Sequence, residues 1–419
     1  MTGLRIVRLA NFVTPSSGGL RTALRELGRG YAQAGHEPVL VVPGPRHTDE
    51  PTEQGRVITL PGPVAPGLGG GYRMLVRRAP LARLLERLAP DRIEVSDRTT
   101  LRWTGAWARR HGVPSVMVSH ESVDGLLGVV KLPAAVRARV AAGLNRASAA
   151  AYDQIVCTTA WAAGEFTGVG AHNVTQVPLG VDLDLFRPDR RDPLVRGEHV
   201  PGGELLLVCC VRLSPEKRPE RALTTLRTLL DRGVAARLVI AGDGPLRSRL
   251  QDAAAGLPVV FTGWISNRER LAGLLASADL VLAPGPMETF GLAALEALAC
   301  GTPAVVSASS ALPAVVGDAG VAVAGEDLAD GVLRLLDRDE RRRRDAARTR
   351  AELFGWDTAV QGFLAVHTAL EHPSVTRAGR AARSAWGTRH GARARRRSFI
   401  ISRRCNESVG LGSNFANRR

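Results

Sequence analysis

The segment 286–303 carries two glutamates in a pattern that suits the binding of hydroxyl groups. It follows an apolar stretch, 279–283, that predicts a buried strand, and it opens a predicted helix. Glu288 falls in the loop and Glu296 in the helix, while Gly291 lets the backbone approach a ligand closely. Because a carboxylate accepts several hydrogen bonds, Glu296 suits the cis-diol of a ribose and Glu288 the hydroxyls of another group. Two solvated acids are the alternative.

Two cations flank the turn that follows another apolar stretch, 205–211. Arg212 and Lys217 both lie near the start of the next predicted helix, where the helix dipole also favours an anion. A diphosphate is the anion that we expect there. Lys217 is one of only two lysines in the chain, which weighs against the alternative of two ordinary surface cations.

Two features of the first half point toward the same ligand. The loop 14–19 ends in Gly18 and Gly19 at a predicted helix start, where backbone amides could contact the anion. His120 directly follows the predicted strand 113–119, so we expect it to project from the carboxyl end of a sheet. A purely structural histidine remains the alternative.

Both halves of the chain begin with the same order of elements. A strand, a loop, a helix and a second strand are predicted at 4–9, 14–19, 20–34 and 38–42, and again at 205–211, 212–215, 222–230 and 238–241. Their continuous apolar runs are typical of parallel sheets covered on both faces. Further candidate strands lie at 113–119, 154–158, 174–178, 259–262, 280–283 and 304–307. We therefore expect an α/β fold of two doubly wound, Rossmann-like parallel-sheet domains that face a cleft.

The composition along the chain predicts its segments. An N-terminal domain should cover 1–186 and a C-terminal domain 204–353, joined by a linker at 187–203 that is rich in Pro, Gly and charge. A final helix is expected within 354–371. The remaining segment, 372–419, has little apolar periodicity and is expected to be a disordered basic tail.

Charge and cysteine content exclude several classes of protein. Of the net charge of +16, +11 falls within residues 372–419, so the rest of the chain is only mildly basic and carries no nucleic-acid signal by itself. The five cysteines form no C-x-x-C pattern and supply no zinc framework. No run of eighteen apolar residues and no secretory signal pattern occurs. These features favour a cytoplasmic location, with peripheral attachment to the inner face of the plasma membrane as an extension of that prediction.

Together these motifs resemble the retaining GT-B glycosyltransferases of family 4, which include bacterial GDP-mannose-dependent phosphatidylinositol α-mannosyltransferases. The E-x7-E pattern of that family is present as Glu288 and Glu296, and its phosphate-binding pair as Arg212 and Lys217. The other matching stretches are V-P-L-G-V-D at 177–182, G-D-G-P at 242–245, F-T-G-W-I at 261–265 and F-G-W-D at 354–357. The resemblance spans about residues 4–370, and it implies that the last helix crosses back to the first domain.

The resemblance implies retaining hexosyl transfer from a nucleotide-diphosphate sugar to a hydroxyl of a lipid or glycan acceptor. GDP-mannose is the expected donor, and UDP-glucose and UDP-N-acetylglucosamine are the next candidates. The implied catalytic residues are His120, which would contact the sugar or acceptor, Glu288, which would hold the donor sugar, and Arg212 and Lys217, which would stabilise the departing diphosphate. Glu296 would hold the ribose. The other implied donor-binding residues are Gly18, Gly19, Gly242, Gly263, Trp264, Ile265, Thr289, Phe290, Gly291 and Leu292.

Three alternatives remain at this point. Asp182 and Asp184 form the D-x-D pattern of metal-dependent transferases, but two cations already serve the phosphates, so we expect no essential metal and no cofactor. A non-hydrolysing sugar-nucleotide epimerase would share the two-domain shape. A basic membrane- or nucleic-acid-binding module rests on the tail and on two predicted basic helices, 72–88 and 131–146, which suit an anionic membrane. Ordinary surface helices explain these two segments equally well, and we expect no specific nucleic-acid partner.

Overall fold

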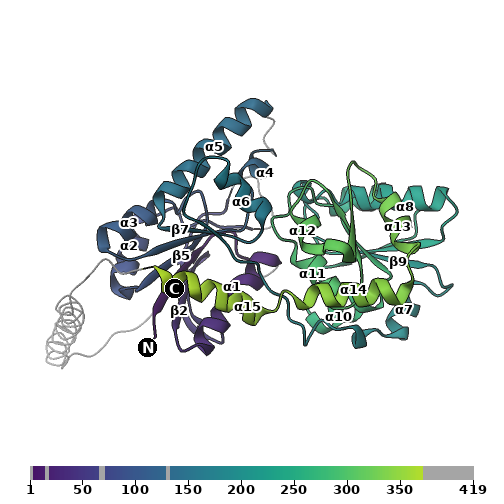
Figure 1. The fold of residues 1–419 in the computed structure, drawn as a ribbon, viewed down its shortest axis with the longest axis horizontal. Helices are drawn as coiled ribbons and strands as arrows, with labels where there is room; N and C mark the ends of the chain where they lie inside the picture. The colour runs from purple at the N-terminus through teal and green to yellow at the C-terminus, as the bar shows by residue number, and fades with distance from the viewer. Residues whose placement is uncertain (1–2, 15–17, 66–70, 129–132, 371–419) are drawn as a thin grey trace, which may run out of the picture. The chain divides into compact units, whose positions relative to one another are not determined.

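A computed structural model describes residues 3–14, 18–65, 71–128 and 133–370. The predictions for the tail 372–419, for Lys131 and for residues 15–17 of the loop 14–19 lie outside these residues. Figure 1 shows the two sheets with their helices, coloured from the N-terminus to the C-terminus. None of the helices in these ranges has the length and apolarity needed to cross a bilayer.

The first sheet has the strand order β3-β4-β2-β1-β5-β6-β7-β8, and all neighbours except β3 and β4 are parallel. Its strands are β1 (Arg5–Ala10), β2 (Glu37–Gly44), β3 (Thr48–Thr52), β4 (Gly55–Pro61), β5 (Arg92–Ser96), β6 (Ser115–Ser119), β7 (Gln154–Cys157) and β8 (Val174–Gln176). The continuous apolar runs are buried, which confirms the predicted parallel sheet. The strands β3, β4 and β5 were not predicted; β3 is an antiparallel edge strand whose sequence, TDEPT, contains no apolar run.

The helices of the first half are α1 (Gly19–Gln33), α2 (Arg78–Leu88), α3 (Trp103–His111), α4 (Val123–Gly128), α5 (Ala134–Ala151) and α6 (Ala160–Thr167). The prediction of a helix over 72–88 was wrong at its start, because α2 begins only at Arg78. Pro80 explains the difference, since proline is tolerated in the first helical turn but breaks a helix further inside. The second basic helix, predicted over 131–146, corresponds to α5.

The second sheet has the order β11-β10-β9-β12-β13-β14 and is parallel throughout. Its strands are β9 (Leu205–Cys210), β10 (Ala236–Ala241), β11 (Val259–Gly263), β12 (Leu280–Ala283), β13 (Ala304–Ser307) and β14 (Gly320–Val323). The helices that accompany it are α7 (Pro193–His199), α8 (Glu220–Asp231), α9 (Arg247–Ala253), α10 (Arg268–Ser277), α11 (Leu292–Ala299), α12 (Leu312–Val316), α13 (Ala329–Leu336) and α14 (Glu340–Glu352). Three short 3-10 helices are η1 (Pro188–Arg190), η2 (Pro215–Lys217) and η3 (Gly317–Ala319).

The last helix, α15 (Trp356–Ala369), returns to the first sheet and lies beside α1 (Figure 1). Its His367 is fully buried, and the ring Nε2 lies 2.9 Å from Oε2 of Glu94 on β5. Arg92 Nε donates to the His367 carbonyl at 2.8 Å. The crossing predicted from the F-G-W-D stretch is therefore confirmed.

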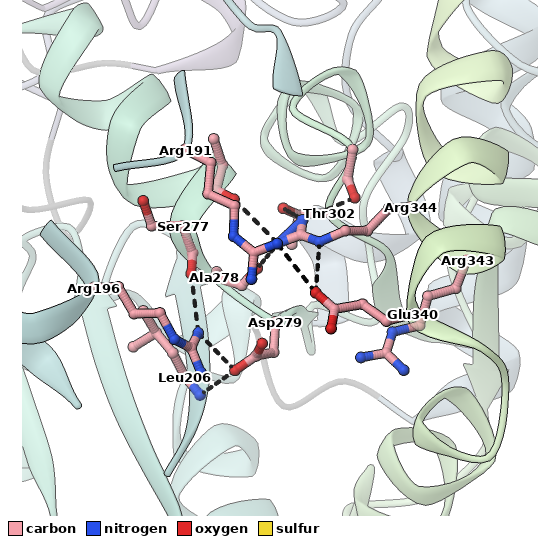
Figure 2. Close-up of polar contacts among 12 residues, drawn as sticks. Arg191, Arg196, Leu206, Ser277, Ala278, Asp279, Thr302, Glu340, Arg343 and Arg344 are labelled. Carbon is pink, nitrogen blue, oxygen red and sulfur yellow. Dashed lines mark hydrogen bonds and ion pairs between the residues drawn. The ribbon is translucent and has the colours of Figure 1, made fainter. Parts of the chain in front are cut away.

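Arginines satisfy backbone carbonyls at the ends of helices in the second half. Arg344 donates to the carbonyls of Ala276 and Ala278 at the end of α10, and Arg196 donates to the Ser277 carbonyl at 3.2 Å and to Asp279 Oδ2 at 2.9 Å (Figure 2). The same Asp279 oxygen accepts the amide of Leu206 at 2.7 Å. These contacts provide partners for carbonyls that a helix leaves unpaired, so part of the arginine content is structural.

Candidate active site

The loop between β12 and α11 places both glutamates as predicted. Glu288 lies in that loop, and Glu296 lies inside α11. Gly291 caps the helix with a φ of 84°, and a Cβ added there would lie 2.1 Å from Cδ2 of Leu312. Only glycine avoids both the left-handed strain and this clash, so Gly291 fixes where the helix begins.

Lys217 and Glu288 form an ion pair at the carboxyl edge of the second sheet. Nζ of Lys217 donates to Oε1 of Glu288 at 2.8 Å, and the two side chains are 29% and 20% exposed. Burial lowers the pKa of Lys217, but the charge and hydrogen bond of Glu288, with the charges of Glu216 and Glu121, together outweigh that effect, so its pKa lies above the ordinary value. Lys217 is therefore a cation at neutral pH that can accept a new anionic partner.

Arg212 lies just after β9 and contacts an aromatic ring from the first half of the chain. Its guanidinium carbon is 4.5 Å from the ring centroid of Tyr72, a cation–π contact. Tyr72 is buried and packs edge-on against Phe12 at 6.3 Å between centroids. No local sequence pattern indicates this contact of Tyr72, because the two residues are 140 positions apart.

Glu296 is paired with a cation that sequence reasoning missed. Nη2 of Arg268, at the start of α10, donates to Glu296 Oε1 at 3.1 Å. Burial raises the pKa of Glu296, and Arg268 offsets part of that shift. The guanidinium also lies over the ring of buried Phe186, 5.0 Å from its centroid. Phe186 belongs to the segment that leads into the predicted linker.

His120 lies directly after β6, at the predicted strand end. Its Nε2 is 3.1 Å from Oγ of Ser96, and burial lowers the pKa of His120 to about 4. The ring is therefore neutral near pH 7. Its carbonyl accepts a hydrogen bond from Oγ1 of Thr289 at 2.6 Å, while the Thr289 carbonyl accepts one from Oγ1 of Thr159 at 2.9 Å. These contacts join the strand exits of the first sheet to the loop that carries Glu288.

The remaining predicted donor-binding residues divide into two groups. Gly19, the first residue of α1, lies against Leu292: a Cβ on Gly19 would be 3.6 Å from Leu292 Cδ1. Gly18 caps α1, and a Cβ added to it would meet no atom of the described residues within 4 Å. The start of α1 thus meets the start of α11. Phe290 is buried and packs edge-on against Phe354 at 6.0 Å, so its ring belongs to the core and only its backbone is available to a ligand.

The second group lies at the exits of β10 and β11. The amide of Gly242 donates to the Gly263 carbonyl at 2.9 Å, and a Cβ on Gly242 would lie 2.0 Å from the Val211 carbonyl oxygen. Because Gly242 has no side chain, the loop that carries Arg212 can pack closely against the exit of β10. Trp264 is 45% exposed, whereas Ile265 is half-buried against the core.

In the described part of the protein, a continuous series of contacts therefore links Lys217, Glu288, Thr289 and His120. Comparison with known proteins identifies the kind of enzyme that has this arrangement. The family model described as "Glycosyltransferase Family 4" matches residues 17–185, and the model "Glycosyl transferases group 1" matches residues 191–352. The chain is 50% identical to the GDP-mannose-dependent alpha-(1-6)-phosphatidylinositol dimannoside mannosyltransferase of Mycobacterium tuberculosis, over 88% of this chain and 97% of that protein.

The chain belongs to glycosyltransferase family 4. A second relative of this glycosyltransferase is the GDP-mannose-dependent alpha-mannosyltransferase of Mycobacterium tuberculosis, 30% identical over 73% of this chain and 79% of that protein. Among solved structures, the sucrose-phosphate synthase of Thermosynechococcus elongatus superposes with a TM-score of 0.69 at 21% identity, covering 87% of this chain and 98% of that one. The trehalose-phosphate synthase of Burkholderia vietnamiensis gives 0.67 at 18% identity, covering 88% and 97%. These likenesses confirm the GT-B fold.

Proposed function

We propose that this glycosyltransferase moves a mannosyl group from GDP-mannose to a hydroxyl of a glycolipid, with retention of configuration. The observation that carries the proposal is the 50% identity to the phosphatidylinositol dimannoside mannosyltransferase over nearly its whole length. The names of the relatives favour a transferase over the epimerase alternative. A soluble glycan is the other acceptor class that the same chemistry allows.

In the proposed reaction, charge develops on the leaving diphosphate, and the site offers cations for it. Arg212 and Lys217 would bind the diphosphate more strongly as the bond from sugar C1 to the phosphate oxygen breaks. Lys217 would then exchange Glu288 for phosphate, which frees Glu288 to hold hydroxyls of the mannose. The acceptor oxygen bonds to C1 on the same face, and its proton passes to the leaving diphosphate.

Residues from both sheets would complete the substrate site. His120, neutral near pH 7, can donate to or accept from a sugar hydroxyl. The amides at Gly18 and Gly19 lie at the start of α1, where a helix favours phosphate oxygens. Glu296 would accept the ribose hydroxyls. Divalent metal has no step in this scheme, and Oδ1 of Asp182, in the D-x-D pattern, accepts the Leu185 amide at 3.0 Å.

The test supplies purified enzyme with GDP-mannose, UDP-glucose or UDP-N-acetylglucosamine, each with and without a phosphatidylinositol mannoside acceptor. We expect GDP release only with GDP-mannose and acceptor together, at the same rate in EDTA. Glu288→Ala and Arg212→Ala should each lower kcat by at least about 100-fold while the protein stays folded. Conversion of donor without acceptor would instead support the epimerase, and normal rates in both variants would refute the site.

A lipid acceptor would require the enzyme to reach a membrane, and the first half offers a suitable surface. A groove of about 640 Å³ between α2 and α3 is lined by Arg78, Ala79, Ala82, Trp103, Ala106, Trp107, Arg109 and Arg110. Apolar side chains with arginines at their edge suit the interface of an anionic bilayer. On α5, Val136 and Val140 are 44% and 40% exposed beside Arg139. Peripheral attachment through the groove between α2 and α3 is part of the proposal.

Sedimentation with vesicles tests this attachment separately from transfer. Binding to phosphatidylglycerol vesicles should weaken with salt, and the double variant Arg78→Glu, Arg110→Glu should bind at least about tenfold more weakly. The double variant Arg341→Glu, Arg342→Glu, at two exposed side chains on α14, has the same change in net charge and is the control. Equal binding by both variants would remove the membrane surface while leaving the proposed chemistry unaffected.

A further inference from the structure

The Arg268–Glu296 pair is built unlike an ordinary surface ion pair. The Glu296 side chain is 10% exposed and that of Arg268 28%, and one hydrogen bond of 3.1 Å joins Nη2 to Oε1. The guanidinium rests on the ring of Phe186, which is fully buried. Because an aromatic face and a carboxylate both hold Arg268, its position is fixed by two independent contacts.

This geometry leaves part of the carboxylate available. A carboxylate offers about four lone-pair positions on its two oxygens, and the single bond from Arg268 takes one of them on Oε1. Oε2 accepts no hydrogen bond from any described residue and can take the hydroxyls of a ligand. The charges of Arg25 on α1 and of Asp182 also shift the pKa of Glu296. The pair therefore lies where the two halves of the chain approach each other.

Burial alone would disfavour the ionised carboxylate that a diol needs as its acceptor. The pKa of Glu296 is raised by burial, and the charge of Arg268 and its hydrogen bond act in the opposite direction. A carboxylate that was free to protonate or rotate would bind a ribose less well. A fixed neighbouring cation opposes both protonation and rotation of the carboxylate.

We infer that Arg268 is a positioning residue that holds the Glu296 carboxylate so that its free oxygen accepts the ribose hydroxyls of the nucleotide. The inference rests on the proposed ribose-binding role of Glu296. It assigns Arg268 no contact with the transferred sugar or the diphosphate. Its loss should therefore weaken recognition of the ribose and leave the turnover of bound donor nearly unchanged.

The test compares the dissociation constants of GDP and 2′-deoxy-GDP, measured by calorimetry. In the unmodified enzyme we expect GDP to bind at least about tenfold more tightly, since a hydrogen bond to a charged group is lost in the deoxy compound. In Arg268→Ala this ratio should fall below about threefold, with a raised KM for the donor and a kcat within about twofold. Arg268→Lys, which keeps the charge but not the planar contact, should restore part of the ratio.

Two further variants make the outcomes distinguishable. Arg196→Ala removes a pair of similar burial, Arg196–Asp279, elsewhere in the same half (Figure 2), so it should lower thermal stability but keep the ratio. In Glu296→Gln, GDP should no longer bind more tightly than 2′-deoxy-GDP. If Glu296→Gln keeps the ratio, the ribose-binding role itself is refuted. If Glu296→Gln loses it but Arg268→Ala and Arg268→Lys both retain the full ratio, only the inference about Arg268 fails. Should Arg268→Ala not fold, Arg268→Lys decides.

Discussion

At the scale of single residues, the ionised groups of this site are paired before a substrate is present. Lys217 is bonded to Glu288 and Arg268 to Glu296, while His120 is kept neutral. Such pairing limits the cost of burying charge. When a nucleotide sugar binds, a phosphate would replace Glu288 as the partner of Lys217. Sugar hydroxyls would then replace Lys217 as the partners of Glu288.

The low pKa of His120 has a consequence for stability. In the unfolded chain a histidine binds a proton near pH 6.5, whereas burial lowers the pKa of His120 to about 4 in the fold. Between these values the unfolded state binds more protons, so this residue's contribution to stability is lost as pH falls from 6.5 toward 4. We expect the unfolding free energy of His120→Asn to depend less on pH in this window than that of the unmodified protein.

Urea denaturation at several pH values measures this difference. Variant and unmodified protein should differ by a constant amount above about pH 7 and converge or cross at lower pH. Parallel curves from pH 7 to pH 4 would mean that His120 takes up a proton in the folded state as easily as in the unfolded one.

The sequence allowed some of these residues to be located and not others. Glu288 and Lys217 lie five and six residues after the apolar stretches 279–283 and 205–211, so their places near strand exits could be predicted from order alone. Arg268 and Tyr72 act through partners that are 28 and 140 positions away. Such contacts depend on how the helices and loops pack, which no local pattern in the sequence encodes.

At the scale of elements, the start of α11 determines where both glutamates lie. Gly291 has a φ of 84°, and a Cβ there would overlap the Leu312 side chain. We expect Gly291→Ala to shift the start of α11 and raise the donor KM at least about tenfold, with a loss of more than ~1 kcal/mol of stability. Gly233→Ala is the matched control, because Gly233 also has a positive φ, 76°, but open space around it.

Kinetics and urea denaturation of the two variants separate strain from displacement. Gly233→Ala should lose about 1 kcal/mol of stability with an unchanged KM, since it carries only the cost of the left-handed backbone. If both variants show the same KM for the donor, the start of α11 does not control the site.

Most strands could be predicted from apolar runs, but β3, β4, β5 and β14 were not predicted. The central predicted strands carry runs of apolar residues that their burial explains, as in β2 and β9, whereas β8 at the sheet edge is neither an apolar run nor buried. Helical periodicity alone extended α2 back to residue 72, whereas the ring of Pro80 restricts its start to Arg78. The polar strand β3 is held by backbone pairing with β4, which a search for apolar patterns cannot detect.

At the scale of the whole molecule, α15 is the element that returns the chain to the first sheet. Glu94 on β5 accepts hydrogen bonds from Arg8 at 2.7 Å, from Tyr31 at 2.8 Å and from His367 at 2.9 Å, all of them buried. Removing α15 would take away the histidine and uncover this cluster of polar groups. The helix is therefore part of the core of the first half rather than an appendage.

Two truncations test this role. A chain that ends at Glu371 keeps α15, and it should retain thermal stability and transfer activity because every catalytic contact described above lies before that point. A chain that ends at Gly355 loses His367 and the packing of Val360 against α1, where a Cβ on Gly30 would already lie 2.3 Å from the valine. It should lose at least ~3 kcal/mol of stability, since a buried charged network is left without a partner. If the shorter chain unfolds at the same urea concentration as the longer one, α15 is not a structural part of the first half. The His367–Glu94 contact then contributes nothing to the stability of the fold.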